Sequence, residues 1–289
     1  MSIRRFNVRS LARGVFSIVV FVILWEIGAR SKQWLGADIF SPFRDLLGKM
    51  GFNKTYLPWI GAVPAPSEVL HAWAGVIVDP GYWQSWYKSF SRVIAGFAAA
   101  MLIGIPFGLL LAVNRVAYGI AFPVFEMLRP IPPLAWVPIS IIFWPTQEMS
   151  IAFVTFLGAF YTIVINVVGG AKSIDVRYFQ AAQSMGSSKW DIFRRIILPG
   201  TLPSIMVGSA VGMGITWEVV VAAEMISGGG SQVGGTGGGG LGFFIWNSYV
   251  GGSYNQIVVG MISIGIAGFI SSDLLRTLGK YVTPWLRLR

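Results

Sequence analysis

The chain has 289 residues, 54% of them hydrophobic and 12% charged, with a net charge of +10 and no cysteine. A soluble domain carries about 25% charged residues, so this composition indicates a membrane protein and excludes a large soluble core. It also excludes disulfides and thiolate metal sites. Few basic residues cluster on any soluble segment, so we expect no nucleic-acid partner.

Long runs without charge locate the transmembrane helices, because crossing a bilayer takes about 20 apolar residues. We expect the first span to be retained rather than cleaved, since no small-x-small site ends it. The run at 225–272 is too long for one helix and has to contain a loop. We therefore predict an all-α polytopic membrane protein, with a cytoplasmic tail at 1–13 and a single transmembrane domain at 14–289. Its helices are expected at about 14–31, 88–113, 117–144, 150–171, 196–226 and 255–276.

The long connection at 30–87 contains a proline-rich element from Val63 to Ser67, followed by an apolar stretch with Trp73. Proline favours an extended segment, and Ser67 is a suitable N-cap. We predict a short amphipathic helix on the outer membrane surface. His71 in this stretch is the chain's one histidine, so a metal site would lack partners.

Prolines at 130, 132, 133 and 138 interrupt the third predicted helix. Each one removes a backbone donor, so the helix has to break where protein or water can receive the freed carbonyls. Arg129 precedes the break and is the one Lys or Arg that we place deep in a span. Its guanidinium offers paired donors to a planar oxyanion; alternatively it pairs with Glu126 and only holds the kinked helix. Trp136 is a further candidate for the wall of a translocation path.

A polar, basic segment at 172–195 separates the fourth and fifth predicted helices. Small side chains at its centre allow close backbone approach, and a glycine supplies a bend. A charged face with one aromatic anchor follows, made of Lys189, Trp190, Asp191, Arg194 and Arg195. Gln180, Ala181, Ala182, Gly186, Ile196, Leu198 and Pro199 fit the order and spacing E-A-A, three residues, G, nine residues, I-x-L-P. This resembles the cytoplasmic EAA loop of ABC importer permeases, with Gln180 in place of glutamate.

The resemblance implies a coupling helix that docks in a groove on an ATP-binding subunit and passes its closure into the membrane. The coupling residues that it implies are Gln180, Ala181, Ala182, Gly186, Asp191 and Arg194. An ordinary amphipathic intracellular loop is the alternative interpretation of this segment.

The fifth predicted helix contains a run from Trp217 to Met225 that is similar to W-x-x-x-V-A-A-E-M in permeases for nitrate, bicarbonate, sulfonates and taurine. The proline-rich elements described above support the same branch. Glu218 and Glu224 are six residues apart and therefore lie on different faces of one helix. Glu218 faces either the axis of a dimer or a cation in a structural ion pair. The path wall has three weaker candidates, Asn166, Thr216 and Trp217. Asn and Thr side chains can equally form hydrogen bonds that join two helices.

The glycine-rich stretch at 228–242 lacks the G-K-[ST] ending of a phosphate loop and follows no predicted strand. We expect an outer loop there, in reach of a docked binding protein. Since the chain contains no Walker motif elsewhere, we expect ATPase activity on a partner subunit and no enzyme activity or cofactor in this chain. ATP and Mg²⁺ would then be bound by the partners.

The distribution of Lys and Arg predicts the orientation. With the N-terminus inside, the inner segments carry most of the basic residues, and the short outer connections near 145–148 and 227–254 carry none. Only the long connection that contains Arg30, Arg44 and Arg92 places basic residues outside. Long connections carry less weight than short ones in the positive-inside rule. Both termini and the EAA-like loop are therefore predicted in the cytoplasm, in a bacterial inner membrane.

The resemblance as a whole implies a type I ABC importer permease fold of the MetI-like kind. It implies a pair of permeases, two ATP-binding subunits and an external substrate-binding protein. Nitrate, with nitrite as an analogue, is the favoured substrate, and bicarbonate, cyanate and alkanesulfonates such as taurine stay open. A stand-alone channel or secondary carrier leaves the EAA-like loop unexplained. A membrane enzyme would need clustered carboxylates or a Ser/His pair, whereas the acids here are dispersed.

Overall fold

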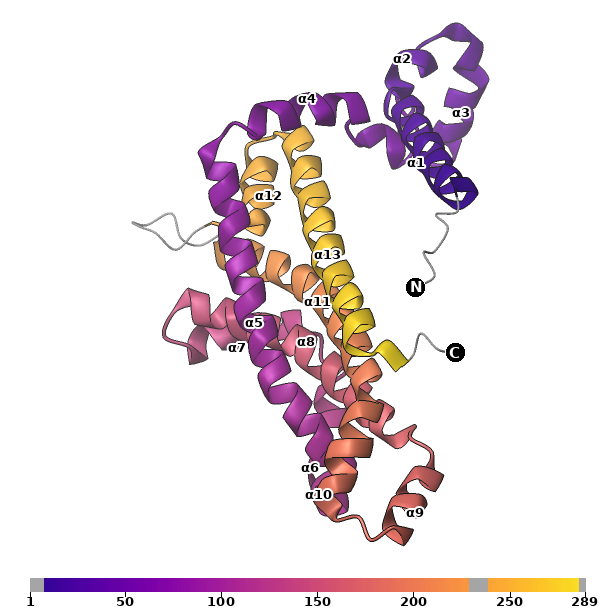
Figure 1. Ribbon diagram of the computed structural model, residues 1–289. Coiled ribbons are helices and arrows are strands. Elements are labelled where there is room, and N and C mark those ends of the chain that lie inside the picture. Colours follow the sequence, from indigo (N-terminus) through magenta and orange to yellow (C-terminus); the bar gives the residue numbers. More distant parts are fainter. Residues whose placement is uncertain (1–7, 229–238, 286–289) are drawn as a thin grey trace. The chain divides into compact units, whose positions relative to one another are not determined.

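The computed structural model describes residues 8–228 and 239–285, and within that part its regular secondary structure is entirely helical (Figure 1). Five helical stretches there are long and apolar enough to cross a membrane. They are Ala12–Ala29, Pro80–Val113, Gln147–Lys172, Lys189–Ser227 and Tyr254–Val282. The predicted tail at 1–13 and the predicted glycine-rich loop at 228–242 lie partly outside the described residues.

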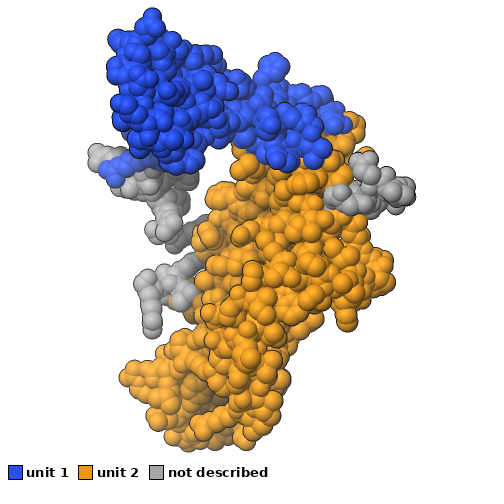
Figure 2. All heavy atoms as spheres, turned by 180° about the vertical axis from the view of Figure 1, so that it is seen from behind, with its two compact units in different colours: residues 1–79, 248–259 blue, residues 80–247, 260–289 orange. Residues whose placement is uncertain are grey.

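The chain packs as two compact units, which Figure 2 colours separately. Unit 1 comprises residues 1–79 and 248–259, and unit 2 comprises residues 80–247 and 260–289. The single domain expected at 14–289 therefore stays a prediction.

Unit 1 contains helix α1 (Val8–Ala29) and the amphipathic helix α4 (Pro66–Val76). The shorter elements between them are α2 (Ser31–Leu35), η1 (Asp38–Phe40), α3 (Ser41–Lys49) and η2 (Ile60–Ala62). We predicted Ser67 as the N-cap of α4, and this is wrong. The helix already begins at Pro66, a proline that needs no N–H partner at this position. Ser67 instead donates its hydroxyl to Glu26 of α1 at 2.9 Å, and Glu26 also pairs with Arg30 at 2.5 Å.

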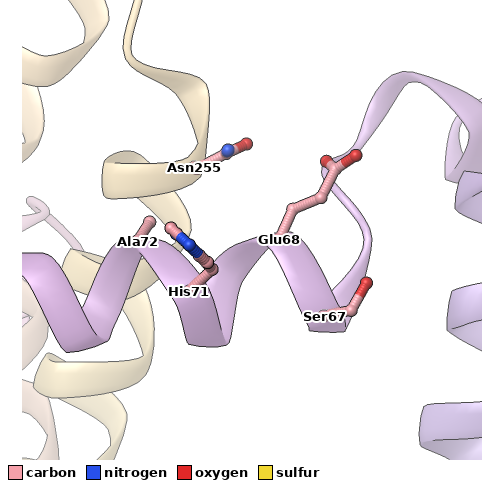
Figure 3. Close-up of a pocket in the computed structure, with 5 residues that line it drawn as sticks. All are labelled: Ser67, Glu68, His71, Ala72 and Asn255. Atoms are coloured by element: carbon pink, nitrogen blue, oxygen red, sulfur yellow. The ribbon is translucent and has the colours of Figure 1, made fainter.

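An open pocket of about 350 Å³ lies in unit 1 beside α4. It is lined by Ser67, Glu68, His71, Ala72 and Asn255. Figure 3 shows Asn255 across from His71 and Ala72. The titratable side chains in its lining are Glu68 and His71, and two such groups on an open surface make no catalytic arrangement. This pocket is therefore not the candidate functional site.

Unit 2 is built around α8 (Gln147–Lys172), which packs between α5 (Pro80–Val113) and α11 (Leu198–Gly228). Val154, Ile163 and Val164 of α8 are completely buried. Glycines allow the close approach: an added Cβ at Gly158 of α8 would lie 3.2 Å from Val219 of α11. Helix α6 (Arg115–Leu128) also belongs to this unit, together with most of α12 (Leu241–Val250) and α13 (Tyr254–Val282).

The third helix, predicted at 117–144 with an interruption at its prolines, is indeed divided. Helix α6 ends at Leu128, a turn follows, and the chain resumes as η3 (Pro133–Trp136) and α7 (Val137–Phe143). Consecutive prolines cannot donate helical hydrogen bonds, so the break falls where the sequence placed the interruption. The apolar piece from 133 to 143 is too short to cross a bilayer by itself.

Candidate functional site

The predicted coupling segment folds into two short helices, α9 (Val176–Ser184) and α10 (Lys189–Ile192), at the end of unit 2 where α11 begins (Figure 1). Asp175 caps α9, accepting hydrogen bonds from the Arg177 amide at 2.9 Å and the Arg177 guanidinium at 2.5 Å. That guanidinium lowers the pKa of the Asp175 carboxyl below its ordinary value. Ser188 caps α10, accepting from the amide of Asp191 at 3.1 Å.

Gly186 ends α9 and turns the chain into α10. Its φ of +74° lies in the left-handed region, which favours glycine. The Ser187 amide bonds to the Ala182 carbonyl and the Gly186 amide to the Gln183 carbonyl, which are the two bonds of a Schellman motif. The bend predicted at Gly186 is therefore present, and no atom lies within 4 Å of an added Cβ.

The coupling segment exposes large apolar side chains between basic ones. Of the predicted coupling residues, Gln180 and Ala181 are exposed and Ala182 is buried. Trp190 is 66% exposed and stacks on Phe193 with the ring centroids 5.5 Å apart. Other exposed members are the apolar Val176, Tyr178 and Met185 and the basic Arg177, Lys189, Arg194 and Arg195. An apolar patch with a charged rim is typical of a protein interaction surface.

A π-helix, η4 (Phe193–Ile197), joins α10 directly to α11. Asp191 and Arg195 face each other beside it, with 3.7 Å between Oδ1 and Nε. No loop separates the coupling segment from the membrane-spanning helix, so a displacement of α10 passes straight into α11. Short π segments occur frequently at functional positions of helices.

Three of the predicted path residues bond to groups within four residues along the chain. Arg129 donates to Glu126 at 2.9 Å, and both side chains are nearly half exposed, so the ion-pair alternative is the arrangement present. Asn166 and Thr216 each donate to a carbonyl of their own helix at 2.8 Å. A role of these residues in the translocation path stays a prediction.

Three further predicted path residues have different surroundings. Trp217 is buried and donates its Nε1 to the hydroxyl of Ser271 at 3.0 Å, joining α11 to α13. The Nε1 of Trp136 is buried and has no partner among the described residues. Glu218 is exposed whereas Glu224 is 1% exposed, so the two carboxylates do lie on different faces of α11.

The charged cluster inside unit 2 is one that the sequence analysis missed. Arg92 was counted with the outer connection and Arg129 was taken as the one cation deep in a span, but Arg92 is 3% exposed and lies well inside α5. It donates to Glu148 of α8, through Nε at 2.7 Å, and to Glu224 of α11 at 2.9 Å. The charge-free run begins one residue after Arg92, so a rule based on such runs missed the polar N-terminal part of α5, which starts at Pro80.

Glu224 also anchors the chain where it enters α12. Its carboxylate accepts from the Ser89 hydroxyl at 2.8 Å and from the Gly242 amide at 2.9 Å. Arg92 donates to the carbonyl of Gly239 at 2.6 Å. The cluster therefore holds α5, α8, α11 and the start of α12 together, and every partner of the buried carboxylate is a donor.

Comparisons with known proteins agree with this geometry. Residues 104–288 match the family described as "Binding-protein-dependent transport system inner membrane component". A putative ABC transporter permease protein of Methanocaldococcus jannaschii is 34% identical over 82% of this chain and 85% of its own length. The nitrate import permease protein NrtB of Synechocystis is 33% identical (77% and 81% covered), and the taurine transport system permease protein TauC of Escherichia coli is 31% identical (77% and 80%).

Solved structures show the same fold. The chain is similar to the MetNI methionine ABC transporter in an inward-facing conformation, with a TM-score of 0.58 and 20% identity over 71% of this chain and 99% of that one. A bacterial ABC transporter that imports alginate gives a TM-score of 0.55 at 13% identity, covering 97% of this chain. The chain thus belongs to the binding-protein-dependent ABC importer permeases, a family of multi-pass membrane proteins, in the branch whose relatives are named for nitrate, bicarbonate and taurine.

Proposed function

We propose that this chain is the membrane-spanning subunit of an ATP-driven importer and that its coupling segment binds an ATP-binding subunit. The observation that carries the proposal is the exposed apolar and basic surface around Trp190, built on two capped helices that lead without a loop into α11. A rigid, capped element is suited to transmit force because its ends do not fray.

The assembly that we propose contains two copies of this chain, two ATP-binding subunits and an external substrate-binding protein. ATP and Mg²⁺ are bound by the partner subunits. Both termini and the coupling segment face the cytoplasm, with the chain in a bacterial plasma membrane, because the basic residues near the coupling segment match the positive-inside rule.

The transport step follows from the connection between α10 and α11. Closure of the ATP-binding subunits displaces α10, and α11 moves with it, so that the cavity opens outward and receives substrate from the binding protein. ATP drives this change only through its differential affinity for the two states, and that affinity resides on the partners.

The substrate that we propose belongs to the small oxyanion-bearing solutes. Nitrate, with nitrite, is the first candidate from the motif resemblance, and bicarbonate, cyanate and the alkanesulfonates are its alternatives. Relatives named for nitrate and for taurine have 33% and 31% identity to this chain, so identity alone favours neither strongly.

The coupling role is tested by Gly186→Glu, with Gly51→Glu as the matched control. Both glycines have positive φ, +74° and +80°, and both have open space around them, so backbone strain and added charge are the same. Gly186→Glu is expected to leave membrane insertion intact but to abolish substrate-stimulated ATP hydrolysis in the reconstituted complex. Gly51→Glu, in unit 1, is expected to retain it. Normal stimulated hydrolysis in Gly186→Glu would contradict the coupling role.

A further inference from the structure

Helix α11 has one packed face and one open face. Residues on the packed face, among them Val219, Val220 and Ala223, are at most 3% exposed. The open stripe consists of Val207, Val211, Gly214 and Glu218, spaced four, three and four residues apart, which places them on one side of an α-helix. Val207 is 58% and Val211 45% exposed, and the nearest atom to an added Cβ at Gly214 is the Ser272 hydroxyl oxygen at 3.8 Å.

Glu218 places a carboxylate on this open stripe, within a helical stretch that is long and apolar enough to cross a membrane. Its side chain forms no hydrogen bond or ion pair with a described residue. A carboxylate within a transmembrane helix is strongly disfavoured against lipid, so the stripe has to face water or protein.

We propose that Glu218 lines the water-filled translocation path and that its carboxylate selects substrates carrying a positively charged nitrogen. The selection of a substrate rests on the proposed importer function; the aqueous exposure of the stripe does not. Gly214, one turn inward, leaves room for a solute beside the carboxylate. In an assembly with two copies of the chain, two such carboxylates would border the path.

The charges elsewhere in unit 2 point the same way. Two arginines of unit 2 are both neutralised: the buried Arg92 by two carboxylates, and the path candidate Arg129 by Glu126. Glu218 therefore contributes an unneutralised charge to the open stripe. Because it repels a bare anion such as nitrate, this residue favours a different candidate of the proposed substrate class from the one that the motif resemblance puts first. A zwitterion with an ammonium group, of which taurine is an example, is the kind of oxyanion-bearing solute that this arrangement favours.

The test exploits the absence of native cysteine. Gly214→Cys is introduced into the full chain in membranes, with Leu102→Cys as the control, because Leu102 is 76% exposed in the apolar part of α5 and is expected to face lipid. Gly214→Cys is expected to react with water-soluble methanethiosulfonates at least about tenfold faster than Leu102→Cys, because the reactive thiolate forms in water. Equal, slow reaction at both positions would overturn the aqueous path and show that the stripe is covered by protein or lipid.

The charge preference is measured on the same cysteine with a cationic and an anionic reagent. The ratio of their rates at Gly214→Cys is expected to fall about tenfold when Glu218→Gln is added, since one nearby charge is removed. An unchanged ratio would overturn the selectivity. Co-purification of ATP-binding subunits is measured on the same preparations. If the subunits co-purify but the cysteine does not react, only the present inference is contradicted. If the cysteine reacts but no subunits co-purify, only the importer function is contradicted.

Discussion

Arg92 is the residue on which the packing of unit 2 depends most. It is 3% exposed, and its guanidinium is shared between a half-exposed carboxylate, Glu148, and a completely buried one, Glu224. A buried charge is tolerated only with its partners in place, so removing the arginine strands Glu224 without its counter-ion. Arg129 differs from Arg92 because both side chains of its ion pair with Glu126 are nearly half exposed.

The two arginines therefore predict different losses of stability. Arg92→Met is expected to lower the free energy of unfolding by about 3–5 kcal/mol, the usual result of breaking one side of a buried pair. Arg129→Met is expected to change it by less than about 1 kcal/mol, as for exposed pairs. Thermal unfolding of the purified variants in detergent checks both values, and equal losses would show that Arg92 is not the structural centre of the unit.

At the scale of single elements, the long helices were predictable because a charge-free run of about 20 residues is typical of a transmembrane helix. Two features were not. The N-terminal part of α5 carries polar residues and reaches back to Pro80, so a rule based on apolar runs placed the start of this helix at 88. The prolines after Arg129 indicated a broken helix, but they could not show that the pieces end at Leu128 and restart at Pro133.

The N-cap of α9 predicts how the coupling segment responds to acid. The guanidinium of Arg177 lowers the pKa of Asp175, so the cap contributes stability that is fully present above the ordinary aspartate pKa of about 4 and is lost as the pH falls through the lowered value. Amide exchange at Arg177 is expected to stay protected down to about pH 4. Asp175→Ala removes the cap, so exchange there should be faster than in the parent chain at every pH above about 4; a variant as protected as the parent chain in that range would contradict this role.

At the scale of the whole molecule, the bend at Gly186 between 172 and 195 could be predicted from the sequence because the motif there is local and its spacing is specific; the coupling role of this segment stays a prediction. The charged cluster of unit 2 could not, because Arg92 is 56 residues from Glu148 and 132 from Glu224, and only the packing of α5, α8 and α11 brings them together. For the path residues, the sequence indicated the polar or aromatic positions but not their partners. Trp217 proved to join two helices, and Glu218 faces outward from α11.

The central claim is that the surface around Trp190 holds an ATP-binding subunit. The most direct measurement is affinity purification of the chain from its native membrane, with identification of the proteins that accompany it and assay of their ATP hydrolysis. We predict that ATP-binding subunits co-purify, that Trp190→Ala removes them, and that Tyr87→Ala, a similarly exposed aromatic on α5, retains them. A chain that purifies alone and still conducts an anion in liposomes would contradict the account and establish a channel instead.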